Sequence, residues 1–374
     1  MTVGWRVSVI VPTFNRAHML GQSVSTLLAQ THPPFEVIVV DDGSSDQTAD
    51  AVAGLAGPVR YIRQDNAGKA VAVNRGLAEA QGDLIWLFDD DDWAEPDAIE
   101  RRLAVLQSHP SLGFVGGGHC MGRAGASGEM LVESRRHMPD HPRDVRRQRL
   151  FEDCYFSLCS ALVHRRCFDE IGGLDVSLKS SEDYDALIRL AARFEFDVID
   201  EVIFTVRQHG GVRGAGEHAY EAAKRREVFR RSDRVVGLKM RREVPLALFQ
   251  PPSWVAAGAS SAWLERAIAM ASKGLVAEAF DDLREHVRQV GVQDGPVRQR
   301  IMDLLWCDYV ADAILDDLSL FAAQLRELRA MGESGRRVLS WLRLAAWRRC
   351  RMRGLPWAQR EPLLRLWLRT LWVD

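Results

Sequence analysis

The sequence predicts an α/β domain followed by an all-α domain, and three observations lead to that prediction. Short β-branched runs alternate with helical patterns between residues 7 and 88. Acid-rich or polar segments directly follow three of those runs. Beyond residue 215 almost all of the periodicity is helical. The alternation predicts a Rossmann-like, mostly parallel sheet that is covered by helices.

The first half of the sheet is predicted from two strand and helix units. Val7–Val11 and Phe35–Val40 are β-branched apolar runs, and Met19–Gln30 between them has helical spacing. This order is typical of a βαβ unit. The strands Val59–Ile62 and Leu84–Phe88 repeat the pattern around a helix over Lys69–Ala80.

The rest of the α/β domain has a mixed pattern between residues 113 and 209. We expect a strand over Leu158–Val163, a loop at Gly172-Gly173, a helix over Glu182–Arg193 and a strand over Phe196–Ile203. The following helical part contains four amphipathic segments, namely Trp263–Ser272, Val276–Val290, Arg298–Leu315 and Leu318–Met331. We therefore predict an α/β domain over residues 1–215, a helical domain over 216–335 and a tail over 336–374.

Composition and charge exclude several classes of protein. The chain has 374 residues, of which 47% are hydrophobic and 27% charged, so a disordered chain is excluded. Six scattered cysteines without a CxxC pair predict reduced thiols in a cytoplasmic protein, with no zinc site. The first residues lack the pattern of a secretory signal. No nucleic-acid-binding motif is present.

The strongest chemical signal is the run of four acids from Asp89 to Asp92, which directly follows the strand that ends at Phe88. Adjacent carboxylates at a buried strand end repel one another, and a divalent cation relieves that repulsion. Oxygen ligands favour Mg²⁺ or Mn²⁺. The alternative is a solvated acidic turn that caps the next helix.

Two further acidic pairs leave two interpretations open. Asp41-Asp42 follows the second strand, where the pair either caps a helix or accepts hydrogen bonds from a base edge and ribose hydroxyls. Glu182-Asp183 opens a helix, where acids are favoured by the helix dipole. A carboxylate there is a general base if it faces the metal site.

Taken together, these segments resemble an inverting family-2 glycosyltransferase of the GT-A fold. The resemblance covers residues 7–209, and six motifs in order carry it. They are SVIVPTFNR (8–16), VVDDGSSDQT (39–48), the Asn66/Gly68 and Asn74-Arg75-Gly76 segment, LFDDDDW (87–93), IGGLD (171–175) and SEDYDALIR (181–189).

The resemblance implies a nucleotide-diphosphate sugar donor, usually a UDP-sugar, and a role for each matching residue. Phe14 would lie against the base and Asp42 would read its edge. The rest of the donor site would comprise Pro12, Thr13, Arg16, Asp41, Asn66, Gly68, Asn74, Asp89 and Asp90. Asp91 would bind Mn²⁺ or Mg²⁺ together with Asp89 and His209, although Asp90 stands where the family usually has a small residue and leaves the ligand choice open. Asp183 would be the catalytic base, with Glu182 orienting it.

The tail from residue 336 carries ten Arg against two acidic residues, a charge of +8, whereas residues 1–335 carry −10. Val338, Trp341, Leu342 and Ala345 share one helical face, and the run LLRLWLRTLW repeats the arrangement. Such a helix either lies on the inner face of the cytoplasmic membrane or packs on the helical domain or on a second copy in a homo-oligomer.

The function that follows is a metal-dependent, inverting, hexosyltransferase-type enzyme. It would transfer a sugar from a nucleotide sugar to a hydroxyl of a glycan or lipid-linked acceptor in cell-surface polysaccharide or glycoconjugate synthesis. The alternatives are a sugar transferase onto a lipid phosphate carrier and a nucleotide-sugar-binding protein without catalysis.

Overall fold

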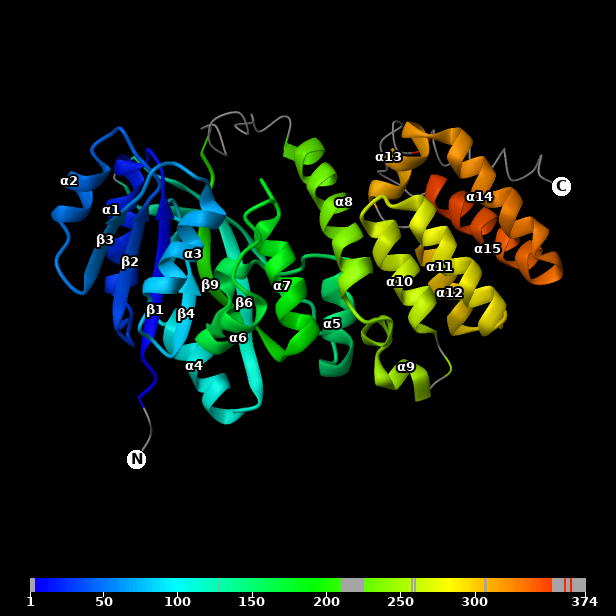
Figure 1. Cartoon of the computed structure of the whole chain (residues 1–374), viewed down its shortest axis with the longest axis horizontal. Coiled ribbons are helices and arrows are strands. Elements are labelled where there is room, and N and C mark those ends of the chain that lie inside the picture. The colour runs from blue at the N-terminus through cyan, green and yellow to red at the C-terminus, as the bar shows by residue number, and fades with distance from the viewer. Residues whose placement is uncertain are drawn as a thin grey trace. The chain divides into compact units, whose positions relative to one another are not determined.

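The computed structural model describes residues 4–126, 128–209, 225–256, 258, 260–305, 308–351, 360 and 364 (Figure 1). The chain divides into two compact units. Unit 1 comprises Met1–Asp140 and Tyr155–Val228, and unit 2 comprises His141–Cys154 and Phe229–Asp374. Residues 141–154, which lie inside the predicted α/β domain, are therefore part of unit 2.

Unit 1 is built on a nine-stranded sheet in the order β3-β2-β1-β4-β8-β6-β9-β5, with β7 paired to β6. The first four strands in this order are parallel, as predicted. Thr13 of β1 pairs with Asp41 of β2, so the polar segments after these strands start at the same edge of the sheet. The four strands are β1 (Val7–Thr13), β2 (Glu36–Asp41), β3 (Val59–Arg63) and β4 (Leu84–Leu87).

The second half of the sheet is mixed. β6 runs parallel to β9, whereas β8 is antiparallel to both β4 and β6, and β5 is antiparallel to β9. The first half of β6 pairs with β8, whereas its second half forms an antiparallel hairpin with β7. These strands are β5 (Trp93–Ala94), β6 (Leu112–Ala124), β7 (Met130–Arg136), β8 (Leu162–His164) and β9 (Glu195–Arg207).

Two local predictions in this half need correction. The strand predicted over Leu158–Val163 is a 3-10 helix over Leu158–Ser160 followed by β8, which begins at Leu162. The long strand β6 was not predicted, because its glycines lower its apparent strand propensity. Those glycines are required by packing: a Cβ at Gly117 would lie 2.3 Å from the Ile203 side chain, and one at Gly116 would lie 2.5 Å from Phe156.

Helices flank this sheet, and its apolar core is formed by strand residues such as Val9, Val39 and Trp86 with helix residues such as Leu20 and Leu103. The α/β prediction is therefore confirmed. The helices of unit 1 are α1 (Ala17–Leu28), α2 (Thr48–Ala53), α3 (Lys69–Glu79), α4 (Ala98–Ser108), α6 (Arg165–Ile171) and α7 (Glu182–Arg193).

Unit 2 is helical throughout its described residues. One helix was predicted over Arg298–Leu315, but the structure has two, α12 and α13, and no Gly or Pro in the sequence marks the break. The helices are α5 (Arg143–Glu152), α8 (Arg225–Glu243), a 3-10 turn over Leu246–Phe249, α9 (Pro252–Ala256), α10 (Ala262–Ser272), α11 (Val276–Gln289), α12 (Pro296–Asp303), α13 (Asp308–Asp316), α14 (Leu318–Ala330) and α15 (Gly332–Cys350).

The first part of the basic tail is the helix α15. Its Val338, Trp341, Leu342 and Ala345 are at most 5% exposed, and α15 packs against α12 and α14. This apolar face is therefore used within unit 2 and is not available to a membrane. Apart from Leu364, the run at residues 363–372 lies outside the described residues.

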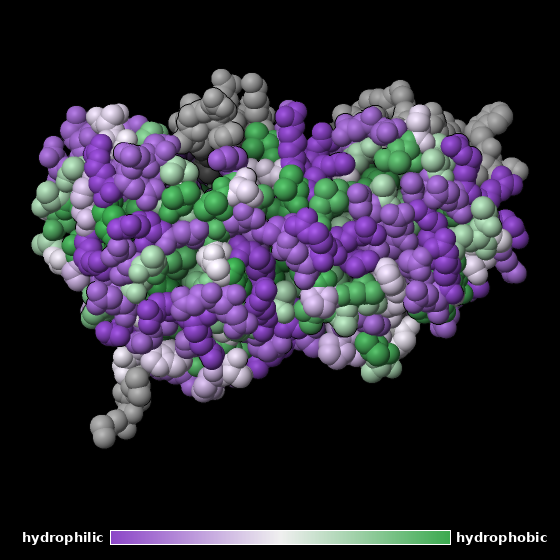
Figure 2. All heavy atoms as spheres, viewed as in Figure 1, coloured by the Kyte–Doolittle hydropathy of each residue, from purple (hydrophilic) through white to green (hydrophobic). Residues whose placement is uncertain are grey.

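Exposed apolar side chains of the described residues are dispersed on the face shown in Figure 2, where hydrophilic residues surround them. Within the described part of the chain, no helix combines the length and the apolar character that a membrane span needs.

Candidate active site

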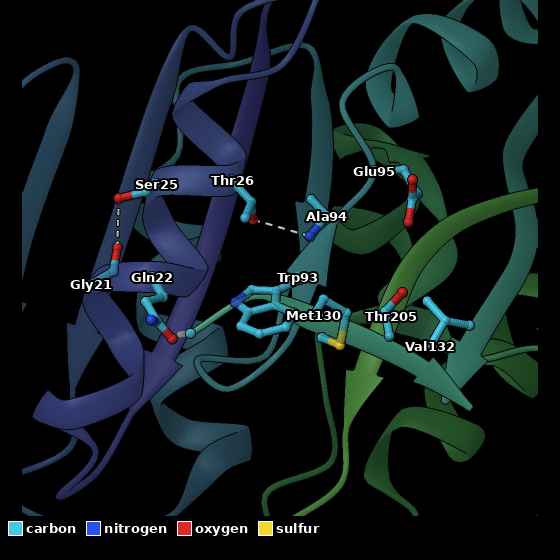
Figure 3. A pocket seen from close by; sticks show the side chains of 11 residues that line it. Gly21, Gln22, Ser25, Thr26, Trp93, Ala94, Glu95, Met130, Val132 and Thr205 are labelled. Carbon is cyan, nitrogen blue, oxygen red and sulfur yellow. Dashed lines mark hydrogen bonds between the residues drawn. The ribbon is translucent and has the colours of Figure 1, made fainter. Parts of the chain in front are cut away.

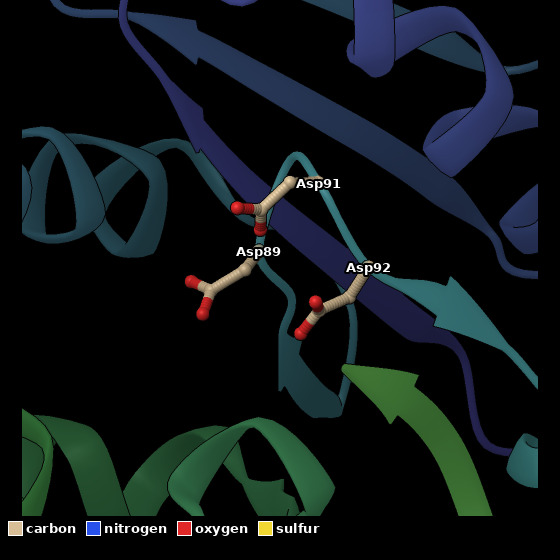
Figure 4. A group of neighbouring side chains, drawn as sticks. All are labelled: Asp89, Asp91 and Asp92. Atoms are coloured by element: carbon tan, nitrogen blue, oxygen red, sulfur yellow. The ribbon is translucent and has the colours of Figure 1, made fainter. Parts of the chain in front are cut away.

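The acidic loop, residues 89–92, connects β4 to β5 and brings three carboxylates together. One oxygen from each of Asp89, Asp91 and Asp92 lies within 4.8 Å of the others (Figure 4). Asp91 and Asp92 are buried, whereas the Asp89 side chain is one-third exposed. Asp92 was not among the predicted metal ligands, although it belongs to the same acidic run.

Asp90 has a different environment from its three neighbours. The Thr13 hydroxyl donates to Asp90 Oδ2 at 2.6 Å, and Arg16 Nη1 donates to Asp90 Oδ1 at 3.0 Å. Burial raises the pKa of Asp90 to about 7, an effect that Arg16 opposes and Asp91 reinforces. Asp90 thus connects the acidic loop to the end of β1, because Thr13 and Arg16 both donate to its carboxylate.

His209 lies against the loop, as the resemblance implied. Its Nε2 is 3.0 Å from Asp91 Oδ2, and Arg16 also forms an ion pair with Asp91. The backbone N–H of Arg207 donates to Asp92 Oδ1 at 3.0 Å, which fixes that carboxylate at the end of β9. The pKa of Asp92 is raised well above its ordinary value by burial and by the charges of Asp91 and Asp89.

This donor set fits a divalent metal ion. Carboxylate oxygens are the preferred ligands of Mg²⁺ and Mn²⁺, and an imidazole nitrogen is acceptable to Mn²⁺. Burial raises the pKa of Asp92 most, and the charges of Asp91 and Asp89 add to the shift, a repulsion that a cation would relieve.

A lysine that the sequence analysis did not assign lies beside the acidic loop. Lys69, the first residue of α3, donates from Nζ to Asp89 Oδ1 at 2.6 Å. Burial alone would lower the pKa of Lys69, but Asp89 and the other acidic groups near it raise the value well above the ordinary one. Glu182 and Asp183 are among those groups. The available signal in the sequence was its position next to Gly68 at the start of a predicted helix.

The predicted base and its neighbour begin helix α7. Ser181 before them has φ +60°, a left-handed conformation that is rare for a residue with a side chain. Asp183 Oδ1 accepts a 2.8 Å hydrogen bond from the Tyr184 N–H. Burial raises the pKa of Glu182, with Lys69 opposing the shift and Asp183 adding to it. The start of α7 therefore lies within electrostatic range of the acidic loop.

The loop before α7 is held by two polar side chains. Asn74 donates from Nδ2 to the Leu174 carbonyl and accepts at Oδ1 from the Leu174 N–H, both at 2.8 Å. Arg189 donates to the carbonyls of Ile171 and Gly173 at 2.8 Å. Asn74 therefore positions the 171–175 loop, and its direct contact with the donor stays a prediction.

The two acids after β2 are turned toward the protein. Asp41 is fully buried and accepts hydrogen bonds from the Ser44 N–H and the Tyr61 hydroxyl. A direct contact of Asp41 with a nucleotide is incompatible with this burial, so its predicted role is corrected to holding the turn after β2. Asp41 does not cap the following helix, because α2 begins only at Thr48.

Asp42 organises the segment that contains Asn66 and Gly68. Its oxygens accept from the N–H groups of Ala67 and Gly68 at 2.9 and 2.8 Å and from Gln64 Nε2 at 2.8 Å. Gly68 has φ +96°, which a glycine adopts without strain. Asn66 is exposed on this loop, and Phe14 is half-buried at the end of β1 next to the buried Pro12.

Comparisons with known proteins agree with this arrangement. The family model described as Glycosyl transferase family 2 matches residues 8–172. A protein of Haemophilus influenzae named "Uncharacterized glycosyltransferase" is 31% identical over 188 residues, which is 49% of this chain and 61% of that protein. A protein of the same name from Rickettsia felis is 26% identical over 54% of this chain and 34% of its own length. The chain thus spans less than two thirds of these curated relatives.

Solved structures show the fold. Staphylococcus aureus TarS 1-349 in complex with UDP-GlcNAc superposes with a TM-score of 0.51 at 17% identity, over 98% of this chain and 90% of that one. The TarS 1-349 structure described without a ligand gives 0.50 at 15% identity, over 99% and 92%. The GT-A prediction is thereby confirmed. Residues 8–172 of the chain thus match the glycosyltransferase family 2 domain.

Proposed function

We propose that the chain is a metal-dependent, inverting glycosyltransferase that moves a hexose from a nucleotide-diphosphate donor to a hydroxyl of a glycan or glycolipid acceptor. The observation that carries the proposal is the meeting of the acidic loop and the start of α7 around Lys69. Asp89 contacts this lysine at 2.6 Å, and the charges of Glu182 and Asp183 also raise the pKa of Lys69. This electrostatic coupling supports a site in which metal ligands and a candidate base act together at the sheet edge.

The acidic loop would hold Mn²⁺ or Mg²⁺ through Asp91 and Asp89, with His209 beside them. Asp92 joins this set on geometric grounds, because its oxygen lies in the same group of three. When bound there, the metal ion would offset the charge of the departing diphosphate. Arg16 and Lys69 are the protein cations next to these carboxylates, and each could turn from its aspartate toward a phosphate oxygen.

Asp183 would take the proton of the acceptor hydroxyl. Its Oδ1 is oriented by the Tyr184 N–H, while Oδ2 has no partner among the described residues and is available to the acceptor. One displacement by the activated hydroxyl inverts the anomeric carbon, and no covalent enzyme intermediate is required. Glu182 precedes Asp183 at the start of α7 and would orient the base or an acceptor hydroxyl.

Phe14 and Asn66 would line the nucleotide pocket, with Pro12, Thr13, Asp42 and Gly68 shaping it from behind. UDP-sugars come first among the donors, since the fold neighbour TarS was solved with UDP-GlcNAc. The five cysteines of the described residues are free, which supports a cytoplasmic site of action.

The test is a panel of nucleotide sugars, with turnover measured by nucleotide release with and without Mn²⁺. We expect Mn²⁺-dependent release with one donor, and we expect Asp183→Asn to lose transfer at least 100-fold while it still binds UDP and Mn²⁺. Asp50→Asn, on the exposed side of α2, is the matched control and should keep full activity.

Two outcomes would overturn the proposal. Near-normal turnover by Asp183→Asn would remove the base. Binding of a nucleotide sugar without turnover on glycan or lipid-linked acceptors would indicate a binding protein.

A further inference from the structure

A pocket of about 590 Å³ opens in unit 1 on the side of α1, β5 and the β6–β7 hairpin (Figure 3). Its volume lies within the ordinary range of small-ligand sites, about 300–1,000 Å³. The apolar part of its lining comes from Trp93, Met130 and Val132. None of the residues assigned above to the donor, the metal or the base lines it.

Three hydrogen-bonding groups in the lining are not used by the protein. The Thr205 side chain is 1% exposed, yet its hydroxyl has no partner among the described residues. The Glu95 carboxylate and Gln22 Nε2 also have no partner there. By contrast, the hydroxyls of Ser25 and Thr26 in the same lining are both hydrogen-bonded to backbone groups. A buried hydroxyl without a partner costs free energy unless a ligand or water completes it.

The lining has the chemistry that suits a neutral sugar. An indole and a thioether offer apolar surface to the C–H face of a sugar ring, while the unpaired groups can bond to the hydroxyls at its edge. No Lys or Arg lines the pocket, so an anionic ligand has no counter-charge. Glu95 is the one ionisable group in the lining, and burial raises its pKa.

The pocket shares a wall with the acidic loop. Trp93 directly follows Asp92, and the Arg207 guanidinium lies 4.2 Å from the centre of the Trp93 ring. Arg207 donates from Nη2 to Gln22 Oε1 at 3.1 Å and from its backbone N–H to Asp92. A ligand in contact with Trp93 and Gln22 therefore lies against the two side chains that position Arg207, the residue that donates to Asp92.

We propose that this pocket binds a neutral sugar residue of the acceptor glycan, at a distance from the hydroxyl that receives the transferred sugar. The assignment to an acceptor rests on the proposed glycosyltransferase function. The sugar-binding chemistry of the pocket does not depend on it.

Gly21 offers a way to fill the pocket without disturbing the fold. It lies in the middle of α1 and lines the pocket, and a Cβ at this position would meet no atom within 4 Å. Leu has a higher helix propensity than Gly, so Gly21→Leu should fold normally. Ala104→Leu, on an exposed position of α4, adds similar bulk away from the pocket and is the matched control.

The experiment measures binding of neutral oligosaccharides of glucose, galactose and N-acetylglucosamine to the full chain by saturation-transfer NMR. We expect one series to bind, with affinity at least tenfold weaker in Gly21→Leu and three- to tenfold weaker in Thr205→Val. Ala104→Leu should bind as the wild type does. UDP and Mn²⁺ binding should remain unchanged in all three variants.

Three results would overturn the proposal. The first is that Gly21→Leu binds the oligosaccharides as tightly as the wild type does, and the second is that no oligosaccharide binds. The third is that the pocket prefers the organic cation tetramethylammonium and loses it in Glu95→Gln, which would identify a cation site. Oligosaccharide binding that is lost in Gly21→Leu, in a chain that turns over no nucleotide sugar, would keep the sugar site and refute the enzyme instead.

Discussion

Two clusters of buried ionisable side chains, one in each unit, differ in how their charge is balanced. In the acidic loop of unit 1, four aspartates face Arg16 and Lys69, with His209 beside them and the Arg207 guanidinium within electrostatic range. In unit 2, the two buried glutamates Glu152 and Glu265 face Arg300 and Arg149 one for one, and the more exposed Asp303 also pairs with Arg300. The unit 2 cluster joins α5, α10 and α12.

The charged side chains of the unit 2 cluster are paired with one another. Arg300 forms ion pairs with both glutamates, Arg149 Nη1 is 2.6 Å from Glu152 Oε2, and Gln148 donates to Glu265 at 3.1 Å. The acidic loop keeps an excess of negative charge at loop positions. An excess of one charge is costly for folding and useful for binding a cation, whereas a balanced cluster fixes how helices pack. We therefore assign binding to the first and architecture to the second.

The largest difference is expected when one charge of the acidic loop is removed. Asp91→Asn should reduce Mn²⁺-dependent transfer at least 100-fold, because it deletes a ligand, and should leave unfolding stability unchanged or slightly higher, because it relieves repulsion. Nucleotide-release kinetics and urea unfolding of the same preparation check both parts. A large loss of unfolding free energy in Asp91→Asn would show that Asp91 stabilises the fold and is not reserved for a metal ion.

The opposite result is expected in unit 2. Arg300→Met leaves Glu152 and Glu265 buried without their shared partner, which should cost about 3–5 kcal/mol of unfolding free energy. Urea unfolding followed by amide hydrogen exchange in α10 and α12 measures the loss. Adding Glu265→Gln and Glu152→Gln to Arg300→Met should recover part of the lost unfolding free energy. A loss below about 1 kcal/mol in Arg300→Met alone would show that the cluster does not hold the helices together.

Metal addition should separate the two clusters without a mutation. Mn²⁺ at 100 times its dissociation constant should stabilise the native chain by about 2.7 kcal/mol if it binds only the folded form. Hydrogen exchange should slow around the acidic loop, and the effect should vanish in Asp91→Asn but persist in Arg300→Met. Persistence in Asp91→Asn would move the metal site elsewhere.

The smallest effect concerns pH in unit 2. His286 is fully buried, its Nδ1 lies 2.8 Å from Ser261 Oγ, and burial lowers its pKa to about 4. In the unfolded chain the His286 imidazole therefore takes up a proton below about pH 6.5, whereas in the folded chain it does so only below about pH 4. Stability from this group is complete above pH 6.5 and falls as the pH drops through that window.

His286→Gln should reduce this acid sensitivity by about 2–3 kcal/mol between pH 6.5 and 4. Thermal melts across the window measure it, with His18→Gln on the exposed side of α1 as the control. Equal pH slopes for wild type and His286→Gln would contradict the assignment.

The parallel half of the sheet was predictable because local pattern and tertiary role agree there. Val7–Val11 and Phe35–Val40 are β-branched and buried, and each became a strand. β6 was not predictable in this way, since Gly116 and Gly117 are present for close packing against Phe156 and Ile203, which the sequence places far away.

Site residues were predictable in proportion to how local their chemistry is. The four acids of Asp89–Asp92 are consecutive, so the sequence alone indicates their chemistry. His209 was predicted from the resemblance to the family. The contacts of Asp41 and Asn74 were not predictable, because their partners, Tyr61 and Leu174, are set by tertiary packing. Lys69 was missed for the same reason, since its contact with Asp89 joins segments twenty residues apart.

The transfer of residues 141–154 into unit 2 changes how the chain can be divided. Leu150 and Phe151 of α5 are fully buried, and Phe151 packs against Phe249. A fragment cut at residue 228 would carry this apolar surface without its cover, so aggregation of that fragment would report the exposed helix α5 and not a failure of unit 1 to fold. A minimal version of unit 1 has to omit α5 as well, by joining residue 140 to residue 155 through a short flexible linker.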